Sequence, residues 1–292
     1  MAGTADDGPL GSPRPSSRQG NGRRNSEGVP RRILHARPPY QSLPLSSPRD
    51  NRRVCTQDET RRHRTPMKFT LGARLTAEFI GTAFLVAAVV GSGVMGEKLA
   101  GGNVAIALLA NTIATGAALI ALISTFGSVS GAHFNPVVSL ADAISGDLSW
   151  PDARAYVAVQ VVGGIAGAAF AHLMFGLPVV SLARHARGGP ALALSEFIAT
   201  FGLLSVIWGC SRFRPAMVPV AVGSYITAAY WFTASTSFAN PAVTIARSLS
   251  NTFAGIRPVD VPLFLGAQIA GGLAATWVFR RLRRVAEIQR EL

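Results

Sequence analysis

Two Asn-Pro dipeptides are the strongest candidates for functional residues in this chain. Asn135-Pro136 and Asn240-Pro241 each lie in a polar joint between apolar runs. Pro suits the first turn of a helix because its missing N–H would have no partner there, and Asn is a strong N-cap. Each dipeptide therefore predicts the start of a short helix whose positive dipole end carries an Asn amide. Such an end orients neutral hydrogen-bonding solutes and opposes cations.

The landmarks around these dipeptides occur twice, in the same order. Each half opens on an apolar segment that contains a carboxylate, Glu78 or Glu196. Each half then reaches its Asn-Pro and closes on a segment in which two residues separate a Gln from Gly-Gly, at Gln160 and Gln268. An isolated Asn-Pro usually marks an ordinary loop turn. The repeat of three landmarks in one order favours a functional pair instead.

Long apolar segments must position these landmarks. The 292-residue chain is 49% apolar and 15% charged, whereas a soluble domain carries about 25% charged residues. Because about 20 apolar residues span a bilayer core, the sequence predicts six spans, near 73–95, 102–126, 153–176, 192–210, 216–234 and 260–279. Gly, Ala and Ser are abundant inside them, which favours close helix contacts in lipid.

The predicted fold is an all-α membrane protein with six transmembrane helices and two half-helices in an inverted repeat. Each half has three predicted spans, an odd number, so the second half inserts upside down relative to the first. Segments 135–144 and 240–250 are too short and too polar to span. Irregular backbone at membrane depth needs protein or a water-filled cavity beside it. The two half-helices are therefore expected to meet at their N-termini around one cavity.

The net charge of +13 lies largely in two arginine-rich tails. Basic residues beside membrane spans mark the cytoplasmic side, so both termini are expected in the cytoplasm and the chain in the plasma (inner) membrane. Arg212 and Arg214 agree with this topology, whereas Arg184 and Arg187 would lie outside, against the rule. No nucleic-acid partner is predicted, although binding by the N-terminal tail is an alternative that its charge leaves open.

Three regions follow from composition. Residues 1–66 are rich in Pro, Ser, Gly and Arg and are expected to form a disordered basic tail. Whether this tail belongs to the native product stays open, because Met67 offers a natural start for a membrane protein. Residues 67–282 form the predicted channel domain, and residues 283–292 a cytoplasmic C-terminal tail.

Two sequence blocks resemble the signatures of the aquaporin, or major intrinsic protein, family. SGAHFNPVVS at 130–139 resembles the first, with Val137 where Ala is usual, and SFANPAV at 237–243 resembles the second. The resemblance covers about residues 70–282 and implies a homotetramer in which each protomer has its own pore. It assigns Glu78 and Glu196 to loop buttressing, whereas Gln160 and Gln268 are interpreted as helix-packing amides. His133 is either a pore-lining donor or a loop-fixing residue. The pore-binding residues that it implies are His133, Asn135, Pro136, Val137, Asn240, Pro241 and Ala242.

In the resembled family four positions form an outer selectivity filter. The Arg that usually follows the second Asn-Pro-Ala is replaced here by Val243, and Arg247, one helical turn on, is not its equivalent by alignment. The filter is therefore expected to be wider and less polar than a water-specific one. A small leak of ions through the pore is also expected. Ala229 is an alternative for the fifth-span position in the implied filter, which consists of Thr115, Tyr230, Ser237 and Val243.

The resulting hypothesis is a passive channel for water and small uncharged solutes, namely glycerol, urea, hydrogen peroxide and neutral metalloids such as arsenite. The pattern resembles bacterial aquaglyceroporin-like channels found with arsenic-resistance genes. Alternatives are a water-selective aquaporin, a scaffold that uses the basic tail, and an ion-coupled transporter, for which only Glu78 and Glu196 are candidate coupling sites. No nucleophile, phosphate loop or metal-ligand cluster is visible, so no enzyme, cofactor or metal site is predicted. Asp142, Asp147 and Asp152 are expected to face solvent.

Overall fold

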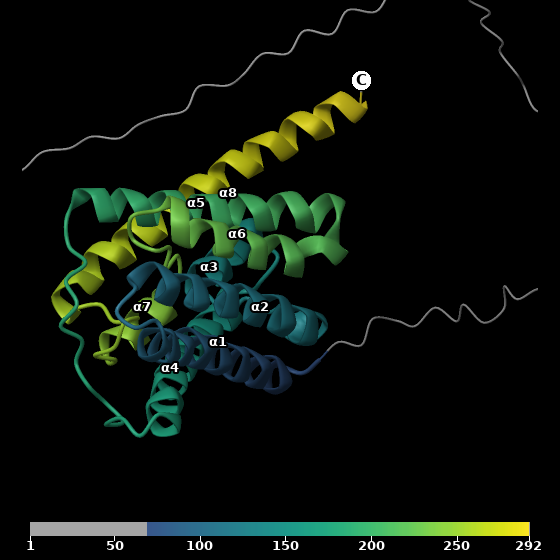
Figure 1. Cartoon of the computed structure of the whole chain (residues 1–292). Coiled ribbons are helices and arrows are strands. Elements are labelled where there is room, and N and C mark those ends of the chain that lie inside the picture. The colour runs from purple at the N-terminus through teal and green to yellow at the C-terminus, as the bar shows by residue number, and fades with distance from the viewer. Residues whose placement is uncertain (1–68, 292) are drawn as a thin grey trace, which may run out of the picture. The chain divides into compact units, whose positions relative to one another are not determined.

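The computed structural model describes residues 69–291, with side chains through residue 282. The expected disordered tail, residues 1–66, lies outside the described residues. Two 3-10 turns, η1 (Pro215–Met217) and η2 (Pro258–Asp260), precede α6 and α8. The α-helices are α1 (Leu71–Leu99), α2 (Val104–Ser130), α3 (Pro136–Ser145), α4 (Trp150–Met174), α5 (Pro190–Phe213), α6 (Val218–Phe232), α7 (Pro241–Ser248) and α8 (Val261–Glu291) (Figure 1).

Each predicted span is helical, but the spans differ in length from the expectation. Within the described part of the chain, five helical segments are long and apolar enough to cross a membrane, namely α1, α2, α4, α5 and Pro258–Leu282. The expected span 216–234 instead forms η1 and the 15-residue α6, which at about 1.5 Å per residue is shorter than a bilayer core of ~30 Å. The last helix runs on to Glu291, past the expected end near 279, because the Arg, Leu, Ala, Glu and Gln residues there favour helix.

The helix contacts follow the repeat. In the first half α1 packs against α2 and α4, and in the second half α5 packs against α6 and α8. The short helices α3 and α7 each contact both α4 and α8. In Figure 1 α3 lies between the layer of α1 and α2 and the layer of α5 and α6, and α7 lies beside α1, which it contacts. The outward helix faces carry exposed apolar side chains suited to lipid, among them Phe84, Ile113, Phe170 and Trp277.

Glycines at matching positions let the paired helices approach closely. A Cβ on Gly163 of α4 would lie 2.5 Å from the Phe79 carbonyl oxygen of α1. A Cβ on Gly271 of α8 would lie 2.3 Å from the Phe197 carbonyl oxygen of α5. Both glycines belong to the Gln-x-x-Gly-Gly landmarks. The landmark therefore marks the contact that joins the first and last spans of each half.

Substitution of Gly271 by alanine is expected to destabilise the protein by about 1–3 kcal/mol, because an inserted methyl group must push α8 away from α5. Thermal unfolding of the detergent-solubilised protein, followed by size-exclusion chromatography, measures this effect. Gly266→Ala on the same helix is the matched control, since no atom lies within 4 Å of its added Cβ. Equal unfolding temperatures for the two variants would contradict the close-approach account.

Candidate functional site

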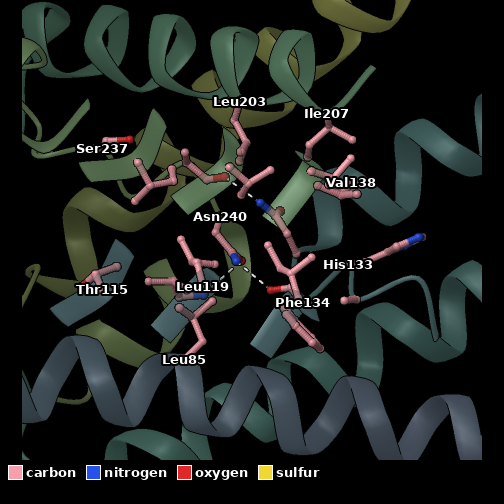
Figure 2. Close-up of a pocket in the computed structure, with 18 of the residues that line it drawn as sticks. Leu85, Thr115, Leu119, His133, Phe134, Val138, Leu203, Ile207, Ser237 and Asn240 are labelled. Atoms are coloured by element: carbon pink, nitrogen blue, oxygen red, sulfur yellow. Dashed lines mark hydrogen bonds between the residues drawn. The ribbon is translucent and has the colours of Figure 1, made fainter. Parts of the chain in front are cut away.

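The two Asn-Pro motifs meet at the N-termini of α3 and α7. Asn135 caps α3 and Asn240 caps α7, and each side-chain oxygen accepts a hydrogen bond at 3.0 Å from the backbone N–H two residues on. The amide nitrogen of Asn135 donates to the Ala239 carbonyl at 2.8 Å, and that of Asn240 donates to the Phe134 carbonyl at 2.7 Å (Figure 2). Each motif thus fixes the other loop. Because an amide nitrogen carries two hydrogens, each Asn retains one for a solute.

The loops before these helices hold several side-chain-bearing residues in the left-handed region. Phe134 has φ +48° and Ala239 has φ +47°, at matching places directly before the two Asn residues. Ala132 at +51° and Ser237 at +47° also match each other. Each such residue costs about 1–2 kcal/mol relative to its ordinary conformation. Surrounding contacts must therefore hold these loops in place.

The carboxylate of Glu78 holds the first loop. Its Oε1 accepts the His133 N–H at 3.0 Å, and its Oε2 accepts the Phe134 N–H at 2.7 Å. The Ser130 hydroxyl donates at 2.6 Å and the Gln160 amide at 2.8 Å. Glu78 is fully buried. Four donors on one carboxylate compensate the cost of burying its charge.

The carboxylate of Glu196 holds the second loop in the same manner. It accepts the Phe238 N–H at 2.9 Å, the Ala239 N–H at 2.8 Å and the Gln268 amide at 2.6 Å. Neither Glu78 nor Glu196 lines the cavity between the loops. This geometry agrees with the expected role in buttressing the loops rather than in contacting a solute, and the role itself stays a prediction.

The two glutamines do more than pack helices. The Gln160 amide also donates to the Ser139 hydroxyl of α3 at 3.0 Å, and the Gln268 amide also donates to the Thr244 hydroxyl of α7 at 2.9 Å. Each Gln therefore links its buttressing carboxylate to a half-helix. The interpretation as helix-packing amides was incomplete, because sequence spacing alone does not show which short helix an amide faces.

A cavity of about 300 Å³ runs past both Asn side chains. Most of its wall is apolar, and polar atoms come from the loops and from a few side chains. A hydrogen-bonding solute in such a cavity therefore contacts a few polar groups on one part of the wall and apolar side chains on the rest. Its apolar wall includes Leu85, Val89, Leu119, Ile123, Leu203 and Ile207.

All four predicted filter residues line this cavity. The Thr115 and Tyr230 hydroxyl groups are 3.3 Å apart, within hydrogen-bond distance, and Ser237 and Val243 line the same space. Ala229, the alternative to Tyr230, does not line it. In Figure 2 Thr115 and Ser237 lie on one side of Asn240 and His133 lies on the other. The filter residues therefore gather away from the His133 end, and their role in selectivity stays a prediction.

His133 combines the two roles that the sequence left open. It lines the cavity, its Nδ1 lies 3.0 Å from the Ser139 hydroxyl, and its Nε2 lies 3.0 Å from an Asp142 carboxylate oxygen. Asp142 and Asp147 were expected to face solvent, and both line the cavity. Asp147 is exposed, as expected, whereas the Asp142 side chain is only 24% exposed because it lies on α3 beside His133. Asp152 instead pairs with Arg74 at 2.8 Å.

Two arginines near the filter, Arg187 and Arg247, were not predicted as site residues from the sequence. Arg247 is buried, lines the cavity and stacks on Phe238, with 3.3 Å between the guanidinium carbon and the ring centroid. It follows Val243 by one helical turn, so the two share a face of α7. Arg187, from the segment between α4 and α5, donates to the Gly255 carbonyl at 2.8 Å. Basic residues beside membrane spans usually mark the cytoplasmic side, and this segment is expected on the other side. The burial of Arg187 explains why a basic residue is present there all the same.

The segment between α4 and α5 lies in a positive field. Burial and the charges of Arg187 and Arg247 lower the pKa of His185 below its ordinary value. His185 is therefore neutral at pH 7 and adds no third charge. Among the described residues, no group of three His, Cys, Asp or Glu side chains could hold a metal ion.

Apolar helices of membrane-spanning length around one cavity, with opposed half-helices capped by Asn, define a multi-pass membrane channel. The chain belongs to the major intrinsic protein family, which matches residues 67–238. This assignment confirms the predicted family and the predicted aquaporin-like fold.

Individual relatives agree with the family assignment. The chain is 55% identical over 219 residues to the aquaglyceroporin AqpS of Rhizobium meliloti (strain 1021), covering 75% of this chain and 94% of that protein. It is 33% identical over 226 residues to the aquaporin NIP1-4 of Oryza sativa subsp. japonica, covering 75% and 80%. The crystal structure of the aquaglyceroporin from Plasmodium falciparum aligns with a TM-score of 0.57 at 18% identity, covering 72% and 96%. At that identity the structural likeness shows the fold alone.

Proposed function

We propose that this protein is a passive channel for water and small uncharged solutes, including glycerol, urea, hydrogen peroxide and neutral metalloids such as arsenite. The observation that carries the proposal is the filter: Thr115, Tyr230, Ser237 and Val243 line one cavity with the two Asn amides, and position 243 lacks an arginine. The similarity to a protein named as an aquaglyceroporin supports the same solute class.

The site suits neutral solutes on physical grounds. The α3 and α7 N-termini and the free hydrogens of Asn135 and Asn240 present donors to a solute oxygen at the centre of the cavity. Apolar side chains form the rest of the wall. A carbon chain with hydroxyl groups can use both surfaces at once, whereas a hydrated cation meets two positive dipole ends at the centre of the cavity.

The competing readings receive less support. A water-selective filter requires a narrower, more polar ring than Thr115 and Val243 provide. The candidate coupling sites of an ion-coupled transporter were Glu78 and Glu196, but both lie off the cavity, each held by at least three donors. We therefore assign transport to this chain and no catalytic step.

Assembly and topology belong to the same proposal. We place the protein in the plasma (inner) membrane as a homotetramer with one pore in each protomer and both termini in the cytoplasm. The exposed apolar helix faces support contact with lipid and with neighbouring protomers. Arg212 and Arg214, at the end of α5, support the cytoplasmic assignment of that end.

Thr115→Phe is expected to lower glycerol permeation about tenfold, because a benzyl group would occupy the filter beside Tyr230. Water permeation should fall less, since water is smaller than glycerol. Stopped-flow light scattering on proteoliposomes of the full chain measures both rates. Thr125→Phe on the exposed face of the same helix is the matched control. Equal glycerol rates in the two variants would remove Thr115 from the filter.

A further inference from the structure

Arg247 carries a buried hydrogen-bond donor that has no partner in residues 69–282, on a side chain that borders the pore. Its side chain is 2% exposed and lines the cavity, and its Nε donates to the Ala254 carbonyl. Its Nη1 is buried and has no partner among the described residues. A buried, charged donor without an acceptor is costly. The atom therefore needs an acceptor that the described part of the chain does not supply.

A second unused hydrogen-bonding group belongs to the same cavity. The Ser237 hydroxyl is buried and also has no partner among the described residues. Ser237 directly precedes Phe238, the ring on which Arg247 stacks. A ligand with two acceptor oxygens could satisfy both residues.

The charge around this point is positive, and the buried Glu196 carboxylate offsets part of it without pairing directly with either guanidinium. The guanidinium carbons of Arg187 and Arg247 lie 5.1 Å and 3.3 Å from the Phe238 ring centroid, so they are at most 8.4 Å apart, the sum of those distances. The Arg187 side chain donates to the Gly255 and Ser235 carbonyl oxygens and to the Thr236 hydroxyl, all neutral acceptors. Within residues 69–282, no carboxylate forms an ion pair with either guanidinium. Two like charges at this distance favour an anion near them.

The inverted repeat shows that the two ends of the cavity carry opposite charges. Arg247 is the seventh residue after Asn240, and its counterpart, the seventh after Asn135, is Asp142. Both line the cavity. Because α3 and α7 meet at their N-termini, these two residues lie toward opposite ends of the cavity. The Arg247 end is thus positive, and the Asp142 end, with Asp147, carries carboxylates.

We propose that Arg247 and Ser237 form a binding site for small oxyanions at the filter end of the pore. The planar fork of a guanidinium matches two oxygens of such an anion. A bound anion occupies the path of neutral solutes, and the carboxylates at the far end oppose its passage. It therefore inhibits the channel rather than crossing it. This inference rests on the proposed function for its flux readout only.

Nitrate is a suitable probe because it is planar, small and ionised at every working pH. Full-chain proteoliposomes are loaded with potassium gluconate, and nitrate replaces gluconate on both sides at constant ionic strength. Glycerol permeation of the wild type is expected to fall about fivefold at saturating nitrate, with half-inhibition at concentrations on the order of millimolar. In Arg247→Gln the nitrate effect should disappear.

Two further variants separate the site from general charge effects. Arg187→Gln removes a charge beside the same ring but off the cavity wall, so nitrate should still inhibit, with a higher half-inhibiting concentration. Ser237→Ala keeps Arg247 and should also raise the half-inhibiting nitrate concentration. This variant tests the proposal even if Arg247→Gln fails to fold. Inhibition of wild type and Arg247→Gln to the same extent, or no inhibition of the wild type, overturns the proposal.

A readout without flux separates this proposal from the proposed function. Nitrate should raise the thermal unfolding temperature of the detergent-solubilised wild type relative to gluconate, because a ligand of the folded state stabilises it. The increase should be smaller in Arg247→Gln. Wild-type protein that lacks glycerol permeation but shows this nitrate shift would contradict the proposed function and keep the anion site. The opposite result is a wild-type protein that passes glycerol but shows no change in flux or unfolding temperature with nitrate. That result would keep the proposed function and contradict the anion site.

Discussion

Val243→Arg is expected to lower glycerol and urea permeation by at least about tenfold while sparing much of the water permeation. Val243 is buried on the wall of a cavity of about 300 Å³, so a guanidinium there would take up space that a three-carbon solute needs. Arg247 lies one turn away on the same helix face and would repel the new charge toward the open lumen. Stopped-flow light scattering with glycerol, urea and sucrose gradients gives the separate rates.

Val243→Leu is the control for the Val243→Arg experiment, because it adds bulk without charge or length. Its glycerol rate should lie between those of wild type and Val243→Arg. If glycerol permeation is the same in wild type and Val243→Arg, with both proteins inserted, Val243 does not belong to the filter and the assignment of all four filter positions fails with it.

Glu196→Gln is expected to destabilise the protein by about 3–5 kcal/mol, the usual range when one partner of a buried charged network is removed. The carboxylate accepts the Phe238 and Ala239 N–H groups and the Gln268 amide. A Gln side chain would turn an NH₂ group toward at least one of these donors. The loop that it releases contains Ala239 in a left-handed conformation, which would relax without this support.

Thermal unfolding and the yield of protein that elutes as a single species measure the effect of Glu196→Gln. Glu97→Gln, an exposed position at the end of α1, makes the same chemical change and should leave both unaltered. A Glu196→Gln protein with wild-type stability but with altered pH dependence of uptake would favour the ion-coupled transporter over the channel.

Much of the fold was predictable because the strongest signals are local or repeated. An Asn-Pro at the start of α3 and another at the start of α7 act through helix capping, which depends on the neighbouring residues alone. The landmarks Glu78 and Glu196 recur with those motifs, and the family resemblance implied their placement against the loops. The length of the spans was less predictable, because α6 begins only after η1 and ends at Phe232, where the chain becomes extended.

Site residues were predictable at the positions that the family pattern specifies. They were missed where a side chain is buried by segments that are distant in the sequence. Arg247 was set aside because it does not align with the usual filter Arg, yet a spacing of four from Val243 already placed both on one helix face. No comparable local signal marked Arg187, whose acceptors Gly255 and Ser235 are remote in sequence. The expected ion leak relied on Val243 alone. With Arg247 on the same cavity, we expect a cation leak only when Arg247 is neutralised.

Passage of small uncharged solutes through this chain is measured by stopped-flow light scattering on wild-type, full-chain proteoliposomes challenged in turn with sucrose, glycerol and urea at equal osmolarity. We expect shrinkage with every solute, followed by rapid re-swelling with glycerol and urea but not with sucrose. Fast shrinkage without re-swelling in glycerol or urea would contradict the proposed solute class and identify a water-selective channel instead.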